Sequence, residues 1–214
     1  RETLIKRFMI KPQKAIYIPN GVDYRGIADS KPRFEDARFR ILYLGRLVRE
    51  KNLETLIRAY KEAKSDVSEM QLMIVGDGPE RRKLRKFAHR TSTKDILWIG
   101  GLPHEEVGSY YKSASVFVLP SPNECSPISI VEAQASGVPV IISDTVNLKI
   151  KMKENGVALV FRKGDERDLA KKILTIYNGG DTKKELILRG KNYAKRFDWN
   201  AIVDRIIMLY LSMF

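Results

Sequence analysis

The sequence predicts an α/β protein with a Rossmann-like, doubly wound parallel sheet of about six strands and helices on both faces. Short apolar runs alternate with amphipathic segments of helical spacing from Arg40 onward, which is typical of a parallel sheet covered on both sides. The 214 residues are 43% hydrophobic, enough to build a proper core. Glycine, arginine, lysine and glutamate concentrate in the loops after the strands, where such sheets bind ligands.

The expected strands are apolar runs bounded by turn residues. Six of them form the sheet, at residues 41–44, 72–75, 96–99, 116–119, 138–142 and 157–161. A separate strand is expected at residues 14–18, followed by a turn at 19–23 and by a polar loop or linker over residues 25–38.

Helices are expected to begin near residues 53, 81, 103, 127 and 165, and two more close the chain at about 182–196 and 199–213. The first carries a core stripe of Leu53, Leu56, Ile57 and Tyr60. The last carries apolar residues in helical register but is interrupted by Asp204 and Arg205, so we expect it to dock on the sheet or on a further domain rather than to enter a membrane.

Composition limits the classes of function. The formal net charge of +13 would suit nucleic acid, an anionic membrane or a phosphorylated substrate. The densest basic run, Arg81–Arg90, is expected either to be a solvated helix face or to bind acidic membrane or nucleic acid. The high Lys and Glu content, which is typical of heat-adapted proteins, weakens any such inference.

The single cysteine, Cys125, excludes an internal disulfide framework and indicates a reducing compartment. The sequence has no secretory signal and no apolar run long enough to span a membrane, so we expect a cytoplasmic protein. The chain opens at Arg1 in the middle of an amphipathic pattern, and we interpret it as a piece of a longer protein.

The stretch from Ser121 to Gly137 predicts a loop and a helix after the strand at 116–119. Ser126 is a good N-cap, and Pro127 suits the first helical position. The backbone amides of Ile128 and Ser129 would then point out of the helix end toward an anion.

Two carboxylates flank that helix end. Glu124 precedes it and, taken alone, could equally be an ordinary partner of the helix dipole. Glu132 lies one turn in, beside the apolar stripe, where a charge is costly unless it is paired or hydrogen-bonded. A positive helix end with two acids suits a ligand that carries both phosphate and hydroxyl groups.

A second loop, from Gly45 to Lys51, offers cations at the end of another strand. Gly45 allows a tight turn, Arg46 can fork two phosphate oxygens and Lys51 supplies a point charge, although both could be plain surface cations. The glycines of Gly76-Asp-Gly78 permit close approach to a ligand, but the third glycine of a dinucleotide fingerprint is absent. By spacing alone, His104 is a cap or surface residue rather than a base.

The ordered motifs strongly resemble the retaining GT-B glycosyltransferases of glycosyltransferase family 4. The matching motifs are Pro19-Asn-Gly-Val-Asp23, Gly45-Arg-Leu with Lys51-Asn52, Val75-Gly-Asp-Gly-Pro79, Leu119-Pro-Ser with Glu124 and Glu132 eight apart, and Ala135-Ser-Gly-Val-Pro-Val-Ile141. The resemblance runs from about residue 14 to the end and covers the family's C-terminal, donor-binding domain. It implies that residues 1–13 are a remnant of the N-terminal domain, 14–196 bind the nucleotide sugar, and 197–214 form a closing helix.

The resemblance also implies roles for these residues. Arg46 and Lys51 would hold the donor diphosphate, Glu132 would accept hydrogen bonds from the ribose, and Glu124 would lie beside the transferred sugar. The Ile128 and Ser129 amides would meet phosphate or sugar. The loops at Gly76 and at Leu102 to His104 would border the base.

The implied donor is a nucleotide-diphosphate sugar, with no metal and no other cofactor. The implied acceptor is a glycan or a lipid-linked sugar, and the implied partner is the protein's own N-terminal GT-B domain. Basic charge is compatible with peripheral binding to an anionic membrane at its inner face, whereas no nucleic acid is expected. The alternatives are a basic nucleic-acid-binding module and a non-catalytic or epimerase-like GT-B relative.

This chain departs from the family pattern at two places. Cys125 and Ser126 follow Glu124 where the family often has glycine and an aromatic residue. The paired glycines usual after the strand at 138–142 are replaced by Ser143-Asp-Thr-Val-Asn147. Both departures fall on the sugar side of the implied site.

Overall fold

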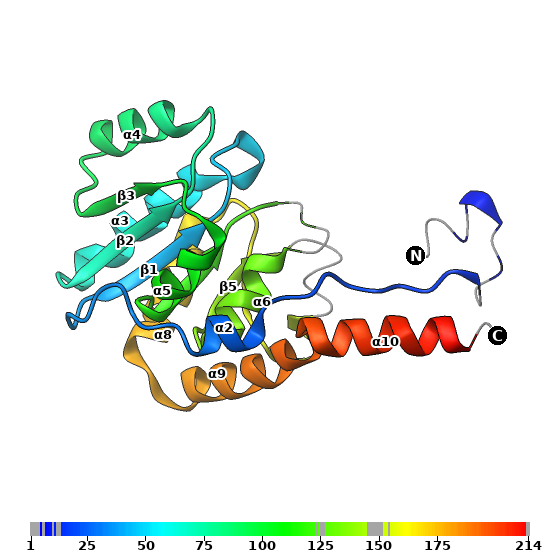
Figure 1. Cartoon of the computed structure of the whole chain (residues 1–214). Helices are drawn as coiled ribbons and strands as arrows, with labels where there is room; N and C mark the ends of the chain where they lie inside the picture. Colours follow the sequence, from blue (N-terminus) through cyan, green and yellow to red (C-terminus); the bar gives the residue numbers. More distant parts are fainter. Residues whose placement is uncertain are drawn as a thin grey trace.

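The structure is a computed structural model of the whole chain, shown in Figure 1. It describes residues 5, 7–9, 11, 14–122, 124, 127–144, 152–153 and 155–212. The expected N-cap Ser126, together with Cys125 and residues 145–147, lies outside these described residues.

One parallel sheet of six strands forms the centre of the domain. Its strands are β1 (Phe39–Leu44), β2 (Met70–Val75), β3 (Ile96–Gly100), β4 (Val116–Leu119), β5 (Val140–Ser143) and β6 (Leu159–Phe161). They lie in the order β3-β2-β1-β4-β5-β6, which is the order of a doubly wound nucleotide-binding sheet. The predicted fold class is therefore confirmed. The chain adds β2 and β3 on one side of β1 and then crosses back to add β4, β5 and β6 on the other side.

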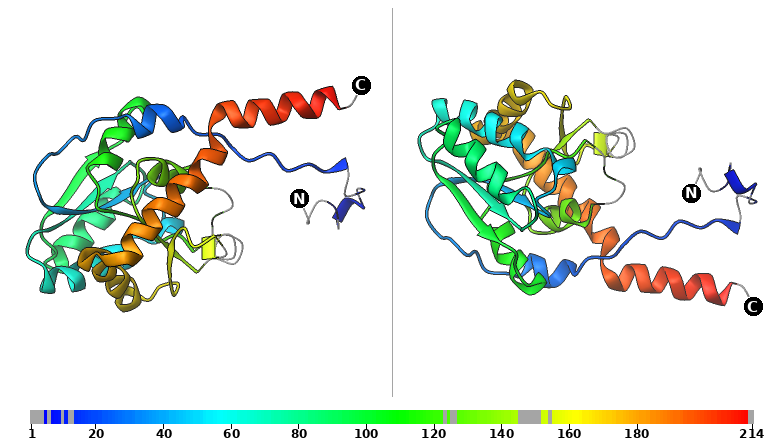
Figure 2. Two further views of the ribbon diagram at one scale, coloured as in Figure 1. Left: turned by 90° about the horizontal axis from the view of Figure 1, so that it is seen from below. Right: turned by 90° about the horizontal axis from the view of Figure 1, so that it is seen from above.

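Helices cover both faces of the sheet, as Figures 1 and 2 show. One face carries α3 (Leu53–Asp66), α4 (Arg81–Arg90) and α8 (Glu166–Asn178), with α3 packed on both α4 and α8. The other carries α2 (Tyr24–Ala28), α5 (Val107–Lys112), α6 (Ile128–Ala135) and α9 (Gly180–Ala194), with α6 in contact with the other three. Short 3₁₀ turns lie at Arg49–Lys51, His104–Glu106 and Lys195–Phe197, and α10 (Trp199–Leu211) ends the described chain.

The core lies where the apolar pattern of the sequence places it. The inner strands β1 and β4 are buried along almost their whole length, whereas most of the edge strand β3 is only half buried. The predicted stripe of α3, from Leu53 to Tyr60, is also buried. Burial on this scale, at about 25 cal/mol per Å² of apolar surface, is the main force that holds the layers together.

Register brings the functional loops together. Leu44 at the end of β1 lies opposite Val75 at the end of β2, so Gly45 and Gly76 follow at the same level of the sheet. The amide of Gly45 donates to the carbonyl of Val75 at 3.0 Å, and the amide of Gly76 donates to the carbonyl of Gly100 at 2.6 Å.

Several sequence-based expectations were wrong in detail. Residues 15–18 form no strand, because this segment leads away from the sheet. The expected loop at 25–38 contains the end of helix α2, which Asp23 caps by accepting the amide of Gly26 at 2.9 Å. The β5 and β6 strands begin two residues later than expected, and the helix after Pro103 opens with a 3₁₀ turn.

The N-terminal segment and α10 project from the same side of the domain in both figures. They are joined where the amide of Val22 donates to the carbonyl of Phe197 at 2.7 Å and Trp199 donates back to Val22 at 3.1 Å. Of the expected α10 stripe, Ile202 is buried, whereas Ile207 and Tyr210 are 49% and 63% exposed. The helix therefore docks on this domain mainly through its first turn.

Candidate functional site

The candidate site lies at the carboxyl ends of the strands, where β1 and β4 are neighbours. The chain leaves β1 toward α3 on one face and leaves β4 toward α6 on the other. Loops that part in this way open a crevice outside the strand ends, which is where doubly wound sheets bind ligands. Arg46 and Lys51 follow β1, and Glu124 and the α6 helix follow β4.

The loops after β1, β2 and β3 surround a cavity of about 240 Å³. Gly45, Arg46, Gly76 and Leu102 line it, as predicted for the donor site, and the apolar side chain of Val107 adds to its wall. The cavity is small and lined mostly by apolar residues and glycines, and so matches a flat ring more closely than a charged group.

Two glycines make this arrangement possible. Gly76 has a φ of +128°, and a Cβ there would lie closer than 3.0 Å to the carbonyl oxygen of Gly45. Gly45 has a φ of +154°, and a Cβ there would lie 3.0 Å from the hydroxyl of Tyr43. The β1 and β2 loops can therefore touch only because Gly76 lacks a side chain, and Gly45 leaves room for the Tyr43 hydroxyl.

The ammonium of Lys51 forms an ion pair with the carboxylate of Glu124 across the crevice. The two side chains are only 25% and 12% exposed, and they come from loops separated by 73 positions in the sequence. The structure thus joins the loop after β1 to the loop after β4 through two of the predicted site residues. Asn52 holds the N-cap position of α3 in a left-handed conformation, with its side chain accepting from the Thr55 hydroxyl at 3.1 Å.

Tyr43 supports the same loop from below. Its side chain is fully buried, and its hydroxyl donates to the backbone carbonyl of Arg46 at 2.9 Å. Burial, and to a lesser degree the nearby charge of Glu124, raises the pKa of Tyr43, so this phenol stays a neutral donor. The guanidinium of Arg46 is left exposed at the rim of the cavity.

The α6 helix begins one residue later than the sequence predicts. Pro127 has an extended ψ of 113° and is the N-cap, so Ile128 is the first helical residue. The amide of Ile130 donates to the carbonyl of Pro127 at 3.3 Å. The amides of Ile128 and Ser129, in the first turn, have no carbonyl four residues back inside the helix and face its amino end. The boundary of the helix is thus shifted by one residue, and the anion-binding role of these two amides stays a prediction.

Glu132 lies one turn into α6 and is 3% exposed. One oxygen, Oε2, accepts a hydrogen bond from the hydroxyl of Tyr111 at 2.9 Å, and the other, Oε1, lies 3.7 Å from Nε2 of His104. Burial raises the pKa of Glu132, while the Tyr111 hydroxyl and the charge of His104 act to lower it. A buried carboxylate is therefore held in place with one oxygen on the side of a largely exposed imidazole.

All ten residues predicted from the sequence lie on the loops after β1 to β4 or on α6. Contacts join Lys51 with Glu124 and His104 with Glu132, and the cavity groups Gly45, Arg46, Gly76 and Leu102. Sequence reasoning missed Tyr43 on β1 and Tyr111 on α5, because a tyrosine in a strand or helix has the same signature as an ordinary core residue.

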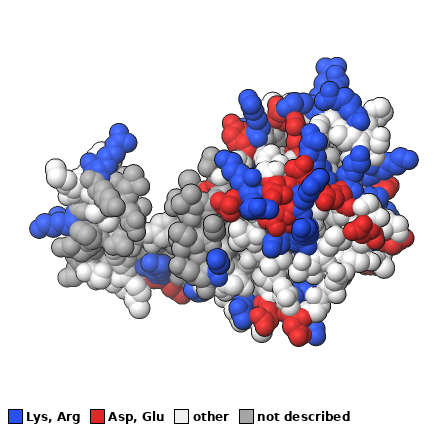
Figure 3. Space-filling model, turned by 180° about the vertical axis from the view of Figure 1, so that it is seen from behind, with Lys and Arg blue, Asp and Glu red and all other residues white. Residues whose placement is uncertain are grey.

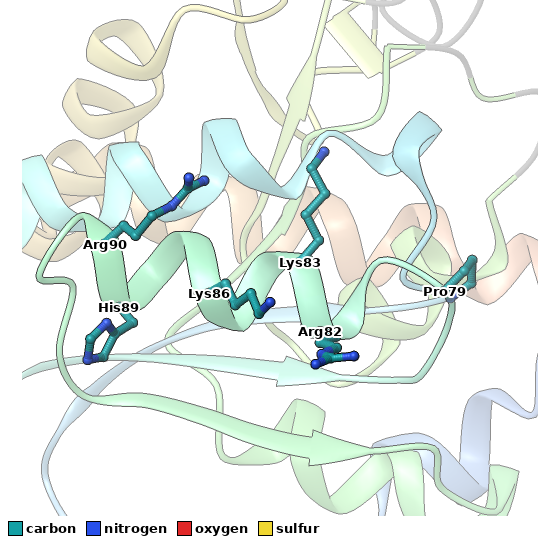
Figure 4. A pocket seen from close by; sticks show the side chains of 6 residues that line it. All are labelled: Pro79, Arg82, Lys83, Lys86, His89 and Arg90. Carbon is teal, nitrogen blue, oxygen red and sulfur yellow. The ribbon is translucent and has the colours of Figure 1, made fainter.

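A larger hollow of about 640 Å³ lies away from this crevice, on the outer surface of α4. All six of its lining residues come from α4 and the turn before it, as Figure 4 shows: Pro79, Arg82, Lys83, Lys86, His89 and Arg90. The apolar side of the same helix, at Leu84, Phe87 and Ala88, is buried.

Among the described residues, no group of three or more His, Cys, Asp and Glu side chains is arranged to hold a metal ion. In the same part of the chain, no helix has the length and apolar character needed to cross a membrane.

Comparison with known proteins agrees with this geometry. The family model described as glycosyl transferases group 1 matches residues 26–193. The UDP-Gal:alpha-D-GlcNAc-diphosphoundecaprenol alpha-1,3-galactosyltransferase of Escherichia coli is 30% identical over 235 residues, covering 100% of this chain and 58% of that protein. The chain spans about half the length, or less, of the curated relatives that it matches.

Solved structures show the same fold. Sucrose-phosphate synthase from Thermosynechococcus elongatus superposes with a TM-score of 0.80 at 26% identity, covering 100% of this chain and 56% of that one. The Anabaena protein HepE, solved in complex with UDP, superposes with a TM-score of 0.83 at 18% identity, covering 99% of this chain and 61% of that one.

The sheet order, the crevice and these likenesses define a Rossmann-like domain of a GT-B glycosyltransferase. The chain belongs to the glycosyl transferases group 1 family, whose model covers most of its length.

Proposed function

We propose that this chain is the donor-binding domain of a retaining, family 4 glycosyltransferase that transfers a hexosyl unit from a nucleotide-diphosphate sugar. The observation that carries the proposal is the Lys51–Glu124 pair, which joins the two loops of the crevice; the first of these loops also lines the 240 Å³ cavity through Arg46. A cation and an acid at one point suit a ligand in which a phosphate adjoins a sugar hydroxyl. The UDP in the HepE structure supports a nucleotide donor.

The proposed roles follow the order of base, ribose, diphosphate and sugar along such a donor. The base enters the cavity between the loops at Gly76 and Leu102. The ribose hydroxyls donate to Glu132 near His104. Arg46 and Lys51 bind the diphosphate.

The sugar end of the donor lies by Glu124. The first-turn amides of Ile128 and Ser129 add hydrogen bonds to phosphate or sugar without bringing a further charge. When the donor binds, Lys51 exchanges its carboxylate partner for a phosphate oxygen, which leaves Glu124 free to accept from the sugar hydroxyls.

Charge on the leaving group decides the chemistry. As the bond between the anomeric carbon and the phosphate oxygen breaks, negative charge grows on the diphosphate. Two cations that are already in position stabilise that charge more in the transition state than in the bound donor. The acceptor hydroxyl attacks from the face that the diphosphate leaves, and the departing phosphate takes its proton. We propose that this needs no divalent metal, since Arg46 and Lys51 supply the positive charge.

The domain needs a second wall, which we propose is the N-terminal GT-B domain of the same protein. Apolar side chains of α10 beyond its first turn are exposed, including Ile207, Met208 and Leu211. Such a row is typical of a surface that another domain covers. Because the acceptor must be held against the donor, the chain by itself should transfer little or no sugar.

Calorimetric titration with UDP, GDP and ADP in the presence of EDTA tests the donor proposal. We expect one of the three to bind, and the Arg46→Ala, Lys51→Ala double variant to lose that binding. Circular dichroism shows whether each protein is folded. A folded parent chain that binds none of the three, or a double variant that binds as well as the parent, would overturn the assignment.

We propose an acceptor that is a glycan or a lipid-linked sugar, with the enzyme at the inner face of a membrane. The Escherichia coli relative is named for a diphosphoundecaprenol acceptor. In this chain, the cationic hollow on α4 offers a surface for anionic lipid, and Arg82 and Lys86 lie one turn apart on it (Figure 4). On the face seen in Figure 3, basic and acidic side chains are interspersed, which is unlike the continuous basic track that nucleic acid requires.

Sedimentation with phosphatidylcholine vesicles, with and without phosphatidylglycerol, tests the membrane proposal. The double variant Arg82→Gln, Lys86→Gln should weaken binding to the anionic vesicles. The control double variant Lys61→Gln, Lys171→Gln removes the same charge from α3 and α8 and should weaken that binding less. Equal losses, or binding to an oligonucleotide with a steep salt dependence and none to vesicles, would contradict it.

A further inference from the structure

Tyr111 is a polar residue in the core that the proposed mechanism leaves without a role. It lies on α5, is fully buried, and packs edge-on against Phe117 of β4 with 5.7 Å between ring centroids. A phenylalanine would fill the same space. The hydroxyl must therefore be explained by what it touches, because a buried hydroxyl is costly unless it is hydrogen-bonded.

That hydroxyl donates to Oε2 of Glu132 at 2.9 Å, and both groups are buried. The contact joins two helices, since Tyr111 lies on α5 and Glu132 on α6. A hydrogen bond to one oxygen fixes the rotation of the whole carboxylate, because the second oxygen is then restricted to the opposite side. That second oxygen, Oε1, lies on the side of His104, whose side chain is 71% exposed.

We propose that Tyr111 is a positioning residue for donor recognition: it holds Oε2 of Glu132 so that Oε1 accepts a hydrogen bond from the ribose hydroxyls of the nucleotide. This inference rests on the proposed function. It adds a residue that does not touch the ligand and acts through Glu132. It also divides the carboxylate between two tasks, with one oxygen held by the protein and one free for the ligand.

Electrostatics agree with this division. The titratable side chains in contact with Glu132 are Tyr111 from α5 and His104 from the 3₁₀ turn, among the described residues. Burial raises the pKa of Glu132, and the Tyr111 hydrogen bond opposes that rise by stabilising the charged form. Loss of the hydroxyl should therefore leave Glu132 both less ordered and more easily protonated.

Tyr111→Phe tests the inference, with Tyr110→Phe as the matched control. Tyr110 is the next residue on the same helix, is also buried, and packs against Phe34 instead. The ligands are UDP and its 2′,3′-dideoxy analogue, with the guanosine and adenosine pairs run in parallel. Tyr111→Phe should weaken the ribonucleotide by about 3- to 10-fold, the scale of one hydrogen bond. It should leave the dideoxy analogue unchanged, and Tyr110→Phe should change neither.

A pH profile separates positioning from packing. Binding of the ribonucleotide should fall on acidification as Glu132 takes up a proton, and in Tyr111→Phe this fall should move to higher pH. An equal loss for both ligands, an unshifted profile, or no loss at all would overturn the inference while leaving the donor site standing. A folded parent chain that binds none of the three ribonucleotides would overturn the proposed function, and this inference with it.

A second measurement does not require Tyr111→Phe to fold. In the unsubstituted chain with ¹³C at the tyrosine ζ position, one of the nine tyrosine resonances should move as Glu132 titrates. The same resonance should stay fixed over that pH range in Glu132→Gln. If no tyrosine signal follows the carboxylate, the hydrogen bond is absent and the inference fails.

Discussion

Replacement of Gly76 by alanine should destabilise the domain more than the same replacement at Gly101 or Gly164. Two costs add at this position. A left-handed backbone costs a residue with a side chain about 1–3 kcal/mol, and Gly76 has a φ of +128°. The new Cβ would also lie closer than 3.0 Å to the backbone oxygen of Gly45, which cannot rotate away. Forcing that loop apart costs about a further 1–3 kcal/mol, so we expect a loss of about 2–6 kcal/mol.

Two other glycines separate these costs. Gly164 has a φ of +75° with open space around its Cβ position, so Gly164→Ala should lose only about 1–2 kcal/mol from backbone strain. Gly101 meets nothing within 4 Å and has no such φ, so Gly101→Ala should stay within about 0.5 kcal/mol of the parent. Urea denaturation followed by tryptophan fluorescence gives the three free energies of unfolding. If Gly76→Ala is as stable as Gly101→Ala, the proposed contact between the β1 and β2 loops does not exist.

Three further predictions concern the site and the last helix. Lys51→Met should weaken nucleoside diphosphate binding by about 1.5–3 kcal/mol, the scale of hydrogen bonds to charged groups. Glu124→Gln releases the Lys51 ammonium from its ion pair and should not weaken nucleoside diphosphate binding. Equal losses of affinity for the two variants in calorimetry would contradict the separate roles proposed for Lys51 and Glu124. Burial raises the folded-state pKa of Glu132 above the ordinary value of 4.5. The stability that Glu132 contributes is therefore present below pH 4.5 and is lost as the pH rises through the folded-state pKa. In urea titrations, the free energy of unfolding of Glu132→Gln should therefore rise relative to that of the parent chain as the pH increases through that window. Parallel pH curves for the two proteins would show that the pKa of Glu132 is not raised in the folded state. Ile202→Ala should lower the free energy of unfolding by about 2–4 kcal/mol, since Ile202 is 2% exposed. Ile207→Ala should lower it by less than about 0.5 kcal/mol, since Ile207 is 49% exposed. Similar melting temperatures for the two variants would contradict the docking of α10 through its first turn.

Much of the fold followed from local patterns. Apolar runs mark the strands β1 to β4, and the helical spacing of apolar residues marks the core stripe of α3. Burial of these apolar residues stabilises both kinds of element. The segment at residues 14–18 shows the limit of this reasoning. Its alternating apolar residues suit a strand, but this part of the chain lies away from both edges of the sheet, so it does not extend the sheet.

The sequence by itself determined the fold class and the loops in which the site lies, because strand and helix periodicity and the turn glycines are local properties. Only the tertiary structure decided which side chains meet. The pairing of Lys51 with Glu124 depends on β1 and β4 being neighbours, and β4 is not the next strand along the chain. The hydrogen bond from Tyr111 to Glu132 depends on the packing of α5 against α6, and no spacing in the sequence encodes a contact between two helices.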